Sequence, residues 1–172
     1  MKDRLRRQQG RMAKLLLAHL VLGIAAPNLF TLFGTIWDYL LSFGVATLVL
    51  ALLDRHYLRF LFAFLSFLLF LVKEIIVSNF ALAWIVIQRK PKLDPGIIGV
   101  PLTARTDIEI TALATSITLP PGTICVDLLT NEDGGRTLYV HAFHVGDPEQ
   151  FRASIKNGYE RRILRITRGG TL

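Results

Sequence analysis

The sequence of 172 residues has a single cysteine, Cys125, and it almost lacks charge over a long internal stretch. One cysteine excludes an intrachain disulfide and a metal cluster of several thiolates, and it fits best as a small buried hydrophobe on a strand. Between residues 15 and 53 the one formally charged side chain is Asp38. A stretch with so little charge is atypical of a soluble domain, so we predict a membrane anchor joined to a polar domain.

Patterns of catalytic and ligand-binding sites are missing as well. The serines are not set in a Gly-x-Ser-x-Gly elbow, and residues 134–136 (GGR) lack the strand-loop-helix context of a phosphate loop. His141 and His144 are expected on opposite faces of one strand, which argues against a shared metal ion. Residues 137–143 lack the basic and aromatic pattern of an RNA-binding strand. We therefore expect no metal, no cofactor, no nucleic acid and no enzyme activity.

The net charge of +7 is unevenly distributed. Residues 1–14 carry six lysines and arginines against one aspartate, whereas residues 89–172 carry eleven against nine acidic residues. Basic residues next to an apolar span are typical of the cytoplasmic side of a membrane protein. We attribute the basic character to membrane topology rather than to nucleic-acid binding, and we predict that residues 1–14 form a basic cytoplasmic arm.

Residues 15–53 are predicted to form two transmembrane helices. The first helix is expected to continue toward Phe33 through Pro27 and Asn28, which together with Gly34 punctuate the link to the second apolar run. That run, residues 33–53, has about twenty residues, enough to cross roughly 30 Å of hydrocarbon. A cleaved signal peptide is the alternative for the first run, but a helical hairpin accounts for both runs. Several small residues would let the helices pack closely, and several aromatic residues would lie in the interfacial belts: Ser42, Gly44, Ala46 and Thr47, and Trp37, Tyr39 and Tyr57.

The longest apolar run, residues 58–87, holds Lys73 and Glu74 near its middle. Its two apolar halves, of about fourteen and thirteen residues, are each too short to span a membrane at 1.5 Å per residue. A full crossing would also move the basic flank after it to the outside, against the charge bias. We predict that residues 54–90 form a long apolar helix that lies in the cytoplasmic interface or is steeply tilted, and a third membrane span is the alternative.

Four polar residues of the apolar segments are candidate contacts or members of an ion path, because ionisable groups at membrane depth usually face protein, water or headgroups. Lys73 and Glu74 are adjacent and point about 100° apart on a helix, so each is expected to meet a different partner. Asp38 is expected one to two turns inside the second span, near the outer interface. His19 is expected to be a neutral, hydrogen-bonded residue between helices, with a proton relay as its alternative.

Residues 96–172 are predicted to form a small cytoplasmic α+β domain in the order β-α-β-β-α. Residues 97–102 read as an irregular or an edge strand because of Gly99 and Pro101. Thr106 and Glu109 have the spacing of a capping box, which predicts a helix of ten to twelve residues after Thr106.

Two alternating strands should follow, residues 123–129 and 137–143, joined by a hairpin turn at residues 131–136. Asp147-Pro148 should start the last helix. The inward-facing residues are predicted to be Ile124, Val126 and Leu128 on the first strand, Leu138, Val140 and Ala142 on the second, and Phe151, Ile155, Tyr159 and Ile163 on the helix.

The helix-to-strand link holds a rigid turn, in which proline fixes φ and glycine supplies a positive φ. We interpret it as a structural turn or docking motif formed by Thr118, Pro120, Pro121, Gly122 and Thr123. Together with LVKEIIVSN at residues 71–79, RTDIEITALATSITLPPGT at residues 105–123 and LYVHAF at residues 138–143, this turn resembles the E-type subunit of the multisubunit cation/proton antiporters of the Mrp, Mnh or Sha type.

The resemblance implies an accessory subunit of a Na+/H+ antiporter complex in the inner membrane of a bacterial or archaeal cell. In that family the large subunits, which are related to respiratory complex I, translocate the ions, and the E-type subunit supports assembly and activity. Its partners would be the other subunits and the lipid bilayer, with Na+ and H+ carried by the whole complex. Two alternatives remain from the residues alone: a self-sufficient small transporter or channel, and a membrane-tethered sensor or binding domain.

Overall fold

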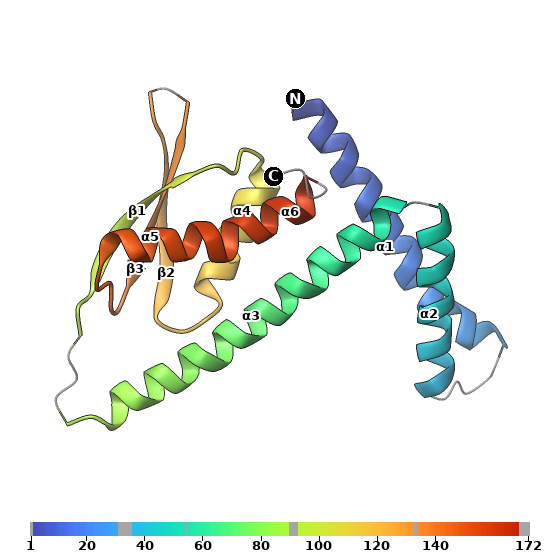
Figure 1. Ribbon diagram of the computed structural model, residues 1–172, viewed down its shortest axis with the longest axis horizontal. Coiled ribbons are helices and arrows are strands. Elements are labelled where there is room, and N and C mark those ends of the chain that lie inside the picture. The colour runs from blue at the N-terminus through green and yellow to red at the C-terminus, as the bar shows by residue number, and fades with distance from the viewer. Residues whose placement is uncertain (1, 31–35, 54, 90–92, 133, 169–172) are drawn as a thin grey trace. The chain divides into compact units, whose positions relative to one another are not determined.

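The computed structural model describes residues 2–30, 36–53, 55–89, 93–132 and 134–168 (Figure 1). The chain divides into two compact units, an N-terminal unit that reaches residue 62 and a second unit made of residues 63–166. One long apolar helix and a small sheet of three strands are both present, as predicted, and the sheet is antiparallel throughout.

The N-terminal unit contains helices α1 (Lys2–Phe30) and α2 (Ile36–Leu53), which pack against each other. The predicted arm, residues 1–14, is helical from Lys2 and continuous with the apolar part of α1, so the helix starts earlier than expected. The expected course of the helix through Pro27 and Asn28 is confirmed, because α1 continues to Phe30. Gly34 lies outside the described residues.

A side chain from α2 explains how α1 accommodates Pro27. Proline has no N–H, so the carbonyl of Gly23, four residues earlier, loses its helical donor. The Ser42 hydroxyl donates a hydrogen bond of 2.8 Å to that carbonyl. Gly23 also allows a close approach, since a Cβ atom there would lie 2.6 Å from the Phe43 ring. The predicted close packing through small residues is found at Ser42 and at Ala46, which is buried.

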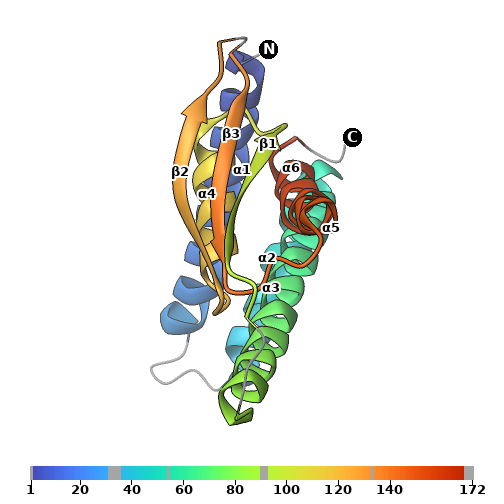
Figure 2. The same cartoon turned by 90° about the vertical axis from the view of Figure 1, so that its left-hand side faces the viewer.

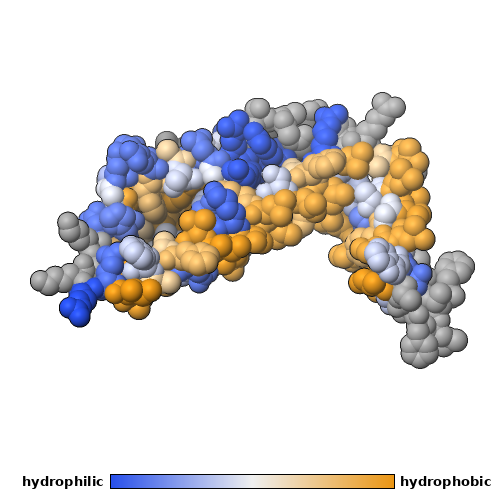
Figure 3. Space-filling model, turned by 60° about the horizontal axis from the view of Figure 1, so that its bottom comes forward, coloured by the Kyte–Doolittle hydropathy of each residue, from blue (hydrophilic) through white to orange (hydrophobic). Residues whose placement is uncertain are grey.

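Helix α3 (Arg55–Ile87) is continuous over 33 residues, and Lys73 and Glu74 do not interrupt it. Within the described chain, Tyr57–Ile87 is the one helical segment long and apolar enough to cross a membrane by length and composition. Ala13–Ala25 and Ile36–Leu52 are shorter apolar helices. Large apolar side chains along α3 are exposed, and they form a hydrophobic strip next to hydrophilic surface (Figure 3): Phe62, Leu65, Leu69, Val72, Ile76, Val77, Phe80, Trp84 and Ile87.

The second unit adds an α+β domain to α3. Its elements are β1 (Gly96–Leu102), α4 (Asp107–Thr118), β2 (Thr123–Thr130), β3 (Arg136–Ala142) and α5 (Pro148–Ser154), followed directly by the π-helical segment η1 (Ile155–Glu160) and α6 (Arg161–Thr167). The strands pair in the order β1-β3-β2, with both neighbouring pairs antiparallel. The predicted capping box is confirmed: the Thr106 hydroxyl accepts from the Glu109 N–H, and the Glu109 carboxylate accepts from the Thr106 N–H.

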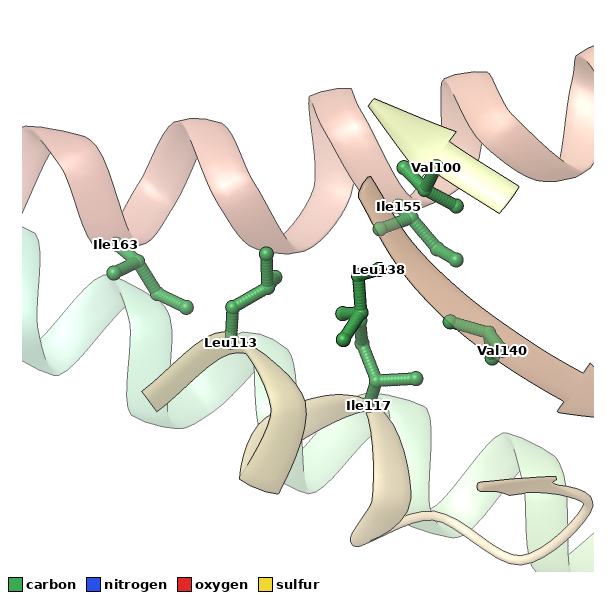
Figure 4. Packing of buried hydrophobic residues seen from close by; sticks show 7 residues of the cluster. All are labelled: Val100, Leu113, Ile117, Leu138, Val140, Ile155 and Ile163. Carbon is green, nitrogen blue, oxygen red and sulfur yellow. The ribbon is translucent and has the colours of Figure 1, made fainter. Parts of the chain in front are cut away.

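The core of the domain lies between one face of the sheet and the helices α4 and α5-η1-α6, which cover that face (Figure 2). The inward residues predicted for β3 are confirmed, since Leu138, Val140 and Ala142 are buried. Figure 4 shows how the central residues of the cluster point toward one another from strands and helices: Val100, Leu113, Ile117, Leu138, Val140, Ile155 and Ile163.

The inward face predicted for β2 is wrong at Ile124 and Val126 and holds at Leu128. Ile124 and Val126 are each 50% exposed, and the half-buried Cys125 faces α4, where its Sγ lies 3.5 Å from the Ala114 carbonyl. A register shift between Cys125 and Asp127 leaves Val126 as the extra residue of a bulge, which reverses the alternation. Leu128 then lies opposite Leu138 on the inner face but stays partly exposed because β2 is an edge strand.

The other edge strand, β1, is covered by basic side chains of the last helix. Arg152 donates to the Gly99 carbonyl at 3.0 Å, and Lys156 donates to the Pro101 carbonyl at 2.9 Å. The edge position predicted from Gly99 and Pro101 is confirmed. Strand edges otherwise expose such groups for pairing with another chain, so these two contacts protect the edge.

Two buried carboxylates bind the link between β1 and α4. Glu160, at the end of η1, accepts from the N–H groups of Thr103 and Ala104 at 2.5 and 2.7 Å. Glu109 accepts from the next two N–H groups, those of Arg105 and Thr106, at 2.9 and 3.2 Å. Four consecutive backbone donors are thus satisfied by two side chains that are almost fully buried.

Candidate functional site

A groove of about 460 Å³ lies between the middle of α3 and the α+β domain. It unites two of the predicted candidate groups, because Glu74 lines it from α3 while Pro120, Pro121 and Thr123 line it from the turn after α4. The domain supplies the remaining wall from α4, α5 and η1, with Ile117, Phe151, Ser154, Ile155, Asn157, Gly158 and Tyr159, and α3 adds Phe70 and Ser78.

Aromatic contacts hold α3 on the domain at one end of this groove. The Phe70 and Tyr159 rings meet edge to face with centroids 5.0 Å apart, and the Arg162 guanidinium lies 4.2 Å from the Phe70 ring centroid. Phe67 packs against the core of the domain. Gly158 allows this approach, since a Cβ atom there would lie 3.2 Å from the Phe70 ring. One face of α3 therefore packs against the α+β domain.

The π-helical segment η1 shapes the domain side of the groove. A π-helix adds one residue to a turn, so the positions that face inward after it lie one residue later in the sequence than an α-helix would place them. Ile155 and Glu160 both point inward and are buried, whereas Asn157, Gly158 and Tyr159 between them line the groove. The predicted stripe is found: Ile155 and Ile163 are buried in the core, and Phe151 and Tyr159 are partly buried and pack against it. Glu160, next to Tyr159, is buried as well.

Lys73 and Glu74 contact each other, contrary to the prediction that each meets a different partner. The Lys73 ammonium lies 3.3 Å from the Glu74 carboxylate, and the two side chains are 69% and 26% exposed. Their long side chains bend together across the angle between the two positions. An exposed pair of this kind contributes about 1 kcal/mol or less, so Glu74 has a weak counterion in Lys73.

The charge of Glu74 acts on the groove wall. Burial raises the pKa of the Tyr159 phenol from 10.0 to about 12, and the negative charge of Glu74 adds to that rise. Tyr159 is therefore a neutral phenol at physiological pH. The wall beside Glu74 combines aromatic faces, a phenol and a carboxylate.

The turn after α4 is fixed by hydrogen bonds of its own residues. The Thr123 hydroxyl donates to the Ile117 carbonyl at 2.6 Å, and the Thr118 hydroxyl accepts from the Cys125 N–H at 3.3 Å. Gly122 has a φ of +107°, a conformation that favours glycine, and its carbonyl accepts from the Phe143 N–H at 3.0 Å. Pro120 is buried. The predicted structural role of this turn has a physical basis in these contacts.

His19 and Asp38 lie in the N-terminal unit. His19 is buried, its Nδ1 is hydrogen-bonded to the Tyr57 hydroxyl, and its Nε2 lies 3.1 Å from the Thr47 hydroxyl and 3.2 Å from the Phe43 carbonyl. Tyr57 is fully buried, so the prediction that it lies in an aromatic belt is wrong. Asp38 lies in the first turn of α2, because that helix begins at Ile36, and it is half-buried.

Sequence reasoning missed Tyr57 and the π segment. The spacing of Glu74 and Ser78, one helical turn apart in an apolar run, was the available signal for the groove-facing side of α3. In the described part of the chain, no group of three or more His, Cys, Asp or Glu side chains is arranged to hold a metal ion.

The sequence matches the family model MNHE, described as Na+/H+ ion antiporter subunit, over residues 12–166. The chain belongs to this antiporter subunit family. It is 31% identical over 162 residues to the E-type Na(+)/H(+) antiporter subunit of Alkalihalophilus pseudofirmus, and the match covers 91% of this chain and 100% of the relative. It is 30% identical over 114 residues to the E-type Na(+)/H(+) antiporter subunit of Bacillus subtilis, covering 66% and 70%.

The fold of this family member is similar to one chain of the membrane-bound sulfane sulfur reductase, an archaeal respiratory membrane complex. The TM-score is 0.54 at 22% identity, covering 88% of this chain and 98% of that chain. A chain of the Mrp complex from Dietzia sp. DQ12-45-1b matches with a TM-score of 0.47 at 25% identity, covering 59% and 93%. As a member of this family, the chain is a component of a transporter.

Proposed function

We propose that the chain is an accessory membrane subunit of a multisubunit Na+/H+ antiporter that supports the assembly and activity of the ion- and proton-translocating subunits. The observation that carries this proposal is the match to the antiporter subunit family over residues 12–166. Its partners are the other antiporter subunits and the lipid bilayer, and Na+ and H+ are ions carried by the complex.

The polar groups of the apolar helices support an accessory role. His19 is hydrogen-bonded to both Tyr57 and Thr47 inside the N-terminal unit, and Lys73 bonds to Glu74. These groups have partners from within the chain, which suits helix packing better than an ion path. The cation exchanged is bound by other subunits in this proposal.

We also propose that α3 lies in the cytoplasmic interface of the cell membrane of a bacterium or archaeon. Phe67, Phe70 and Glu74, in the middle of α3, face the domain, while other sides of the helix are apolar and exposed. If α3 crossed the bilayer, the Arg162 guanidinium over Phe70 would lie at hydrocarbon depth, where a charge costs about 2.5–3.5 kcal/mol on insertion scales. An interfacial α3 leaves its apolar strip in lipid and its other face on the domain.

The N-terminal hairpin then provides the membrane anchor. Helices α1 and α2 cross the bilayer, the basic residues of α1 and of the start of α3 face the cytoplasm, and the α+β domain is cytoplasmic. The chain is multi-pass in this topology. A cysteine introduced at Asn131, in the hairpin between β2 and β3, tests it, because labelling of that thiol by an impermeant reagent from outside intact cells contradicts a cytoplasmic domain.

Truncation of the α+β domain tests the accessory role. We expect deletion of residues 96–172 to lower Na+/H+ antiport by reducing recovery of the assembled complex. Antiport and complex recovery equal to those of the full chain contradict the proposal. Ion flux from the purified chain alone in lipid vesicles would instead support a self-sufficient transporter.

A further inference from the structure

The groove between α3 and the α+β domain has one charged residue in its walls, and no residue of opposite charge lines it. Among its described lining residues, Glu74 carries the sole formal charge, and the walls are otherwise aromatic, apolar or neutral and polar. The exposed Lys73 forms a surface pair with Glu74 and does not line the groove. The lining of the groove therefore carries one negative charge, that of Glu74.

The groove also suits the stem of a long cationic side chain. Phe70, Phe151 and Tyr159 present aromatic surface beside the Glu74 carboxylate. Aromatic faces attract ammonium and guanidinium groups and pack against the methylene stems of lysine and arginine. Arg162, the basic residue of α6 that lies over Phe70, is engaged by the carbonyls of Asn157 and Gly158 at 3.3 and 2.8 Å.

We propose that this groove receives a lysine or arginine side chain from the cytoplasmic end of a helix in another antiporter subunit, with Glu74 as its counterion. The inference rests on the proposed function, which brings α3 and the groove to the cytoplasmic membrane surface. Membrane proteins concentrate lysine and arginine in the short cytoplasmic segments next to their helices. A neighbouring subunit therefore offers basic side chains at this level of the bilayer.

A charge reversal in the assembled complex tests this contact. With an affinity tag on this chain, Glu74→Lys is expected to reduce the recovery of other antiporter subunits about tenfold or more, and Glu74→Gln is expected to reduce it less. Glu149→Gln is the matched control, because Glu149 is an 80% exposed carboxylate on α5 outside the groove, and its recovery should equal that of the unchanged chain. The melting temperature of each full-length chain shows whether the variants fold.

Second-site changes identify the partner residue. Replacing the correct lysine or arginine of another subunit by glutamate should restore recovery with Glu74→Lys. Full recovery of the complex with Glu74→Lys overturns the inference. The inference is also overturned if the Glu74→Gln chain recovers all subunits but binds less phosphatidylethanolamine than the unchanged chain. That result would mean that the amine of a lipid headgroup occupies the groove. If the unchanged chain itself recovers no antiporter subunit, the proposed function fails instead.

Discussion

Removal of the Glu160 carboxylate should destabilise the α+β domain more than removal of any exposed carboxylate. Glu160 is 2% exposed, and its Oε1 accepts from the N–H groups of Thr103 and Ala104. A hydrogen bond to a charged group contributes roughly 1.5–3 kcal/mol, so Glu160→Ala should lower the free energy of unfolding by about 3–5 kcal/mol. The Oε2 pair with Lys156, at 2.8 Å and with Lys156 35% exposed, adds about 1 kcal/mol or less.

Glu160→Gln separates the hydrogen bonds from the charge. The amide oxygen can still accept from both N–H groups, as neutral bonds of about half the strength, so the loss should be about 1–2 kcal/mol. For a domain of this size 1 kcal/mol corresponds to roughly 4–8 °C, so Glu160→Ala should lower the melting temperature by more than about 10 °C. Glu149→Ala, which breaks an exposed pair with Arg152, should change it by less than about 5 °C.

The measurement is the temperature at which half of the α+β domain becomes cleavable by a protease, with the full-length chain in detergent. The order of melting temperatures should be Glu149→Ala, then Glu160→Gln, then Glu160→Ala as the lowest. If Glu160→Ala melts at the same temperature as Glu149→Ala, the assignment of Glu160 as the hydrogen-bond acceptor for the N–H groups between β1 and α4 is refuted.

Three further predictions use the same melting measurement on the full chain. Tyr57→Phe leaves Nδ1 of the buried His19 without its hydroxyl partner and should lower the free energy of unfolding by about 1–3 kcal/mol. Thr47→Val should lower it less, because the Phe43 carbonyl still faces Nε2 of His19, and an equal loss from both variants would contradict this arrangement. Gly23→Ala should destabilise α1–α2 packing because its Cβ meets the Phe43 ring at 2.6 Å, whereas Gly44→Ala, with nothing within 4 Å, should stabilise by about 0.5–1 kcal/mol. The raised pKa of Tyr159 means that the folded chain holds the phenol proton more tightly than the unfolded chain, so the contribution of Tyr159 to stability is present below pH 10 and is lost between pH 10 and about 12. Tyr159→Phe should remove that loss, and melting temperatures of the two chains that fall in parallel over this pH range would contradict it.

Local rules predicted much of the α+β domain because its signals are short-range. The Thr106 capping box, the Gly134 hairpin and the alternation in β3 each depend on a few adjacent residues, and each is found. The face of β2 could not be predicted, because the bulge at Val126 reverses the alternation and leaves no mark in the composition of the strand. The inward Glu160 was missed for the same reason, since a π segment shifts the helical period by one residue.

Contacts between elements were predicted less well than the elements themselves. Tyr57 looked like an interfacial aromatic because it follows an apolar run, yet its partner His19 lies 38 residues earlier in the sequence. The groove depends on Phe70 meeting Tyr159, a pairing that no local pattern encodes. The functional roles of Lys73, Glu74, His19 and Asp38 stay predictions.

The π segment η1 gives the last helix one place where its length can change. A π turn holds one residue more than an α turn, so deleting one residue between Ile155 and Glu160 would turn the segment into an ordinary α-helix and leave the residues after it on the same face. Ile163 would then stay in the core, and Arg162 would stay over Phe70. The same deletion within α5 would rotate everything after it by about 100° and take Ile163 out of the core. Members of the family should therefore accept a one-residue alignment gap in the π segment but not in the helical turns before it.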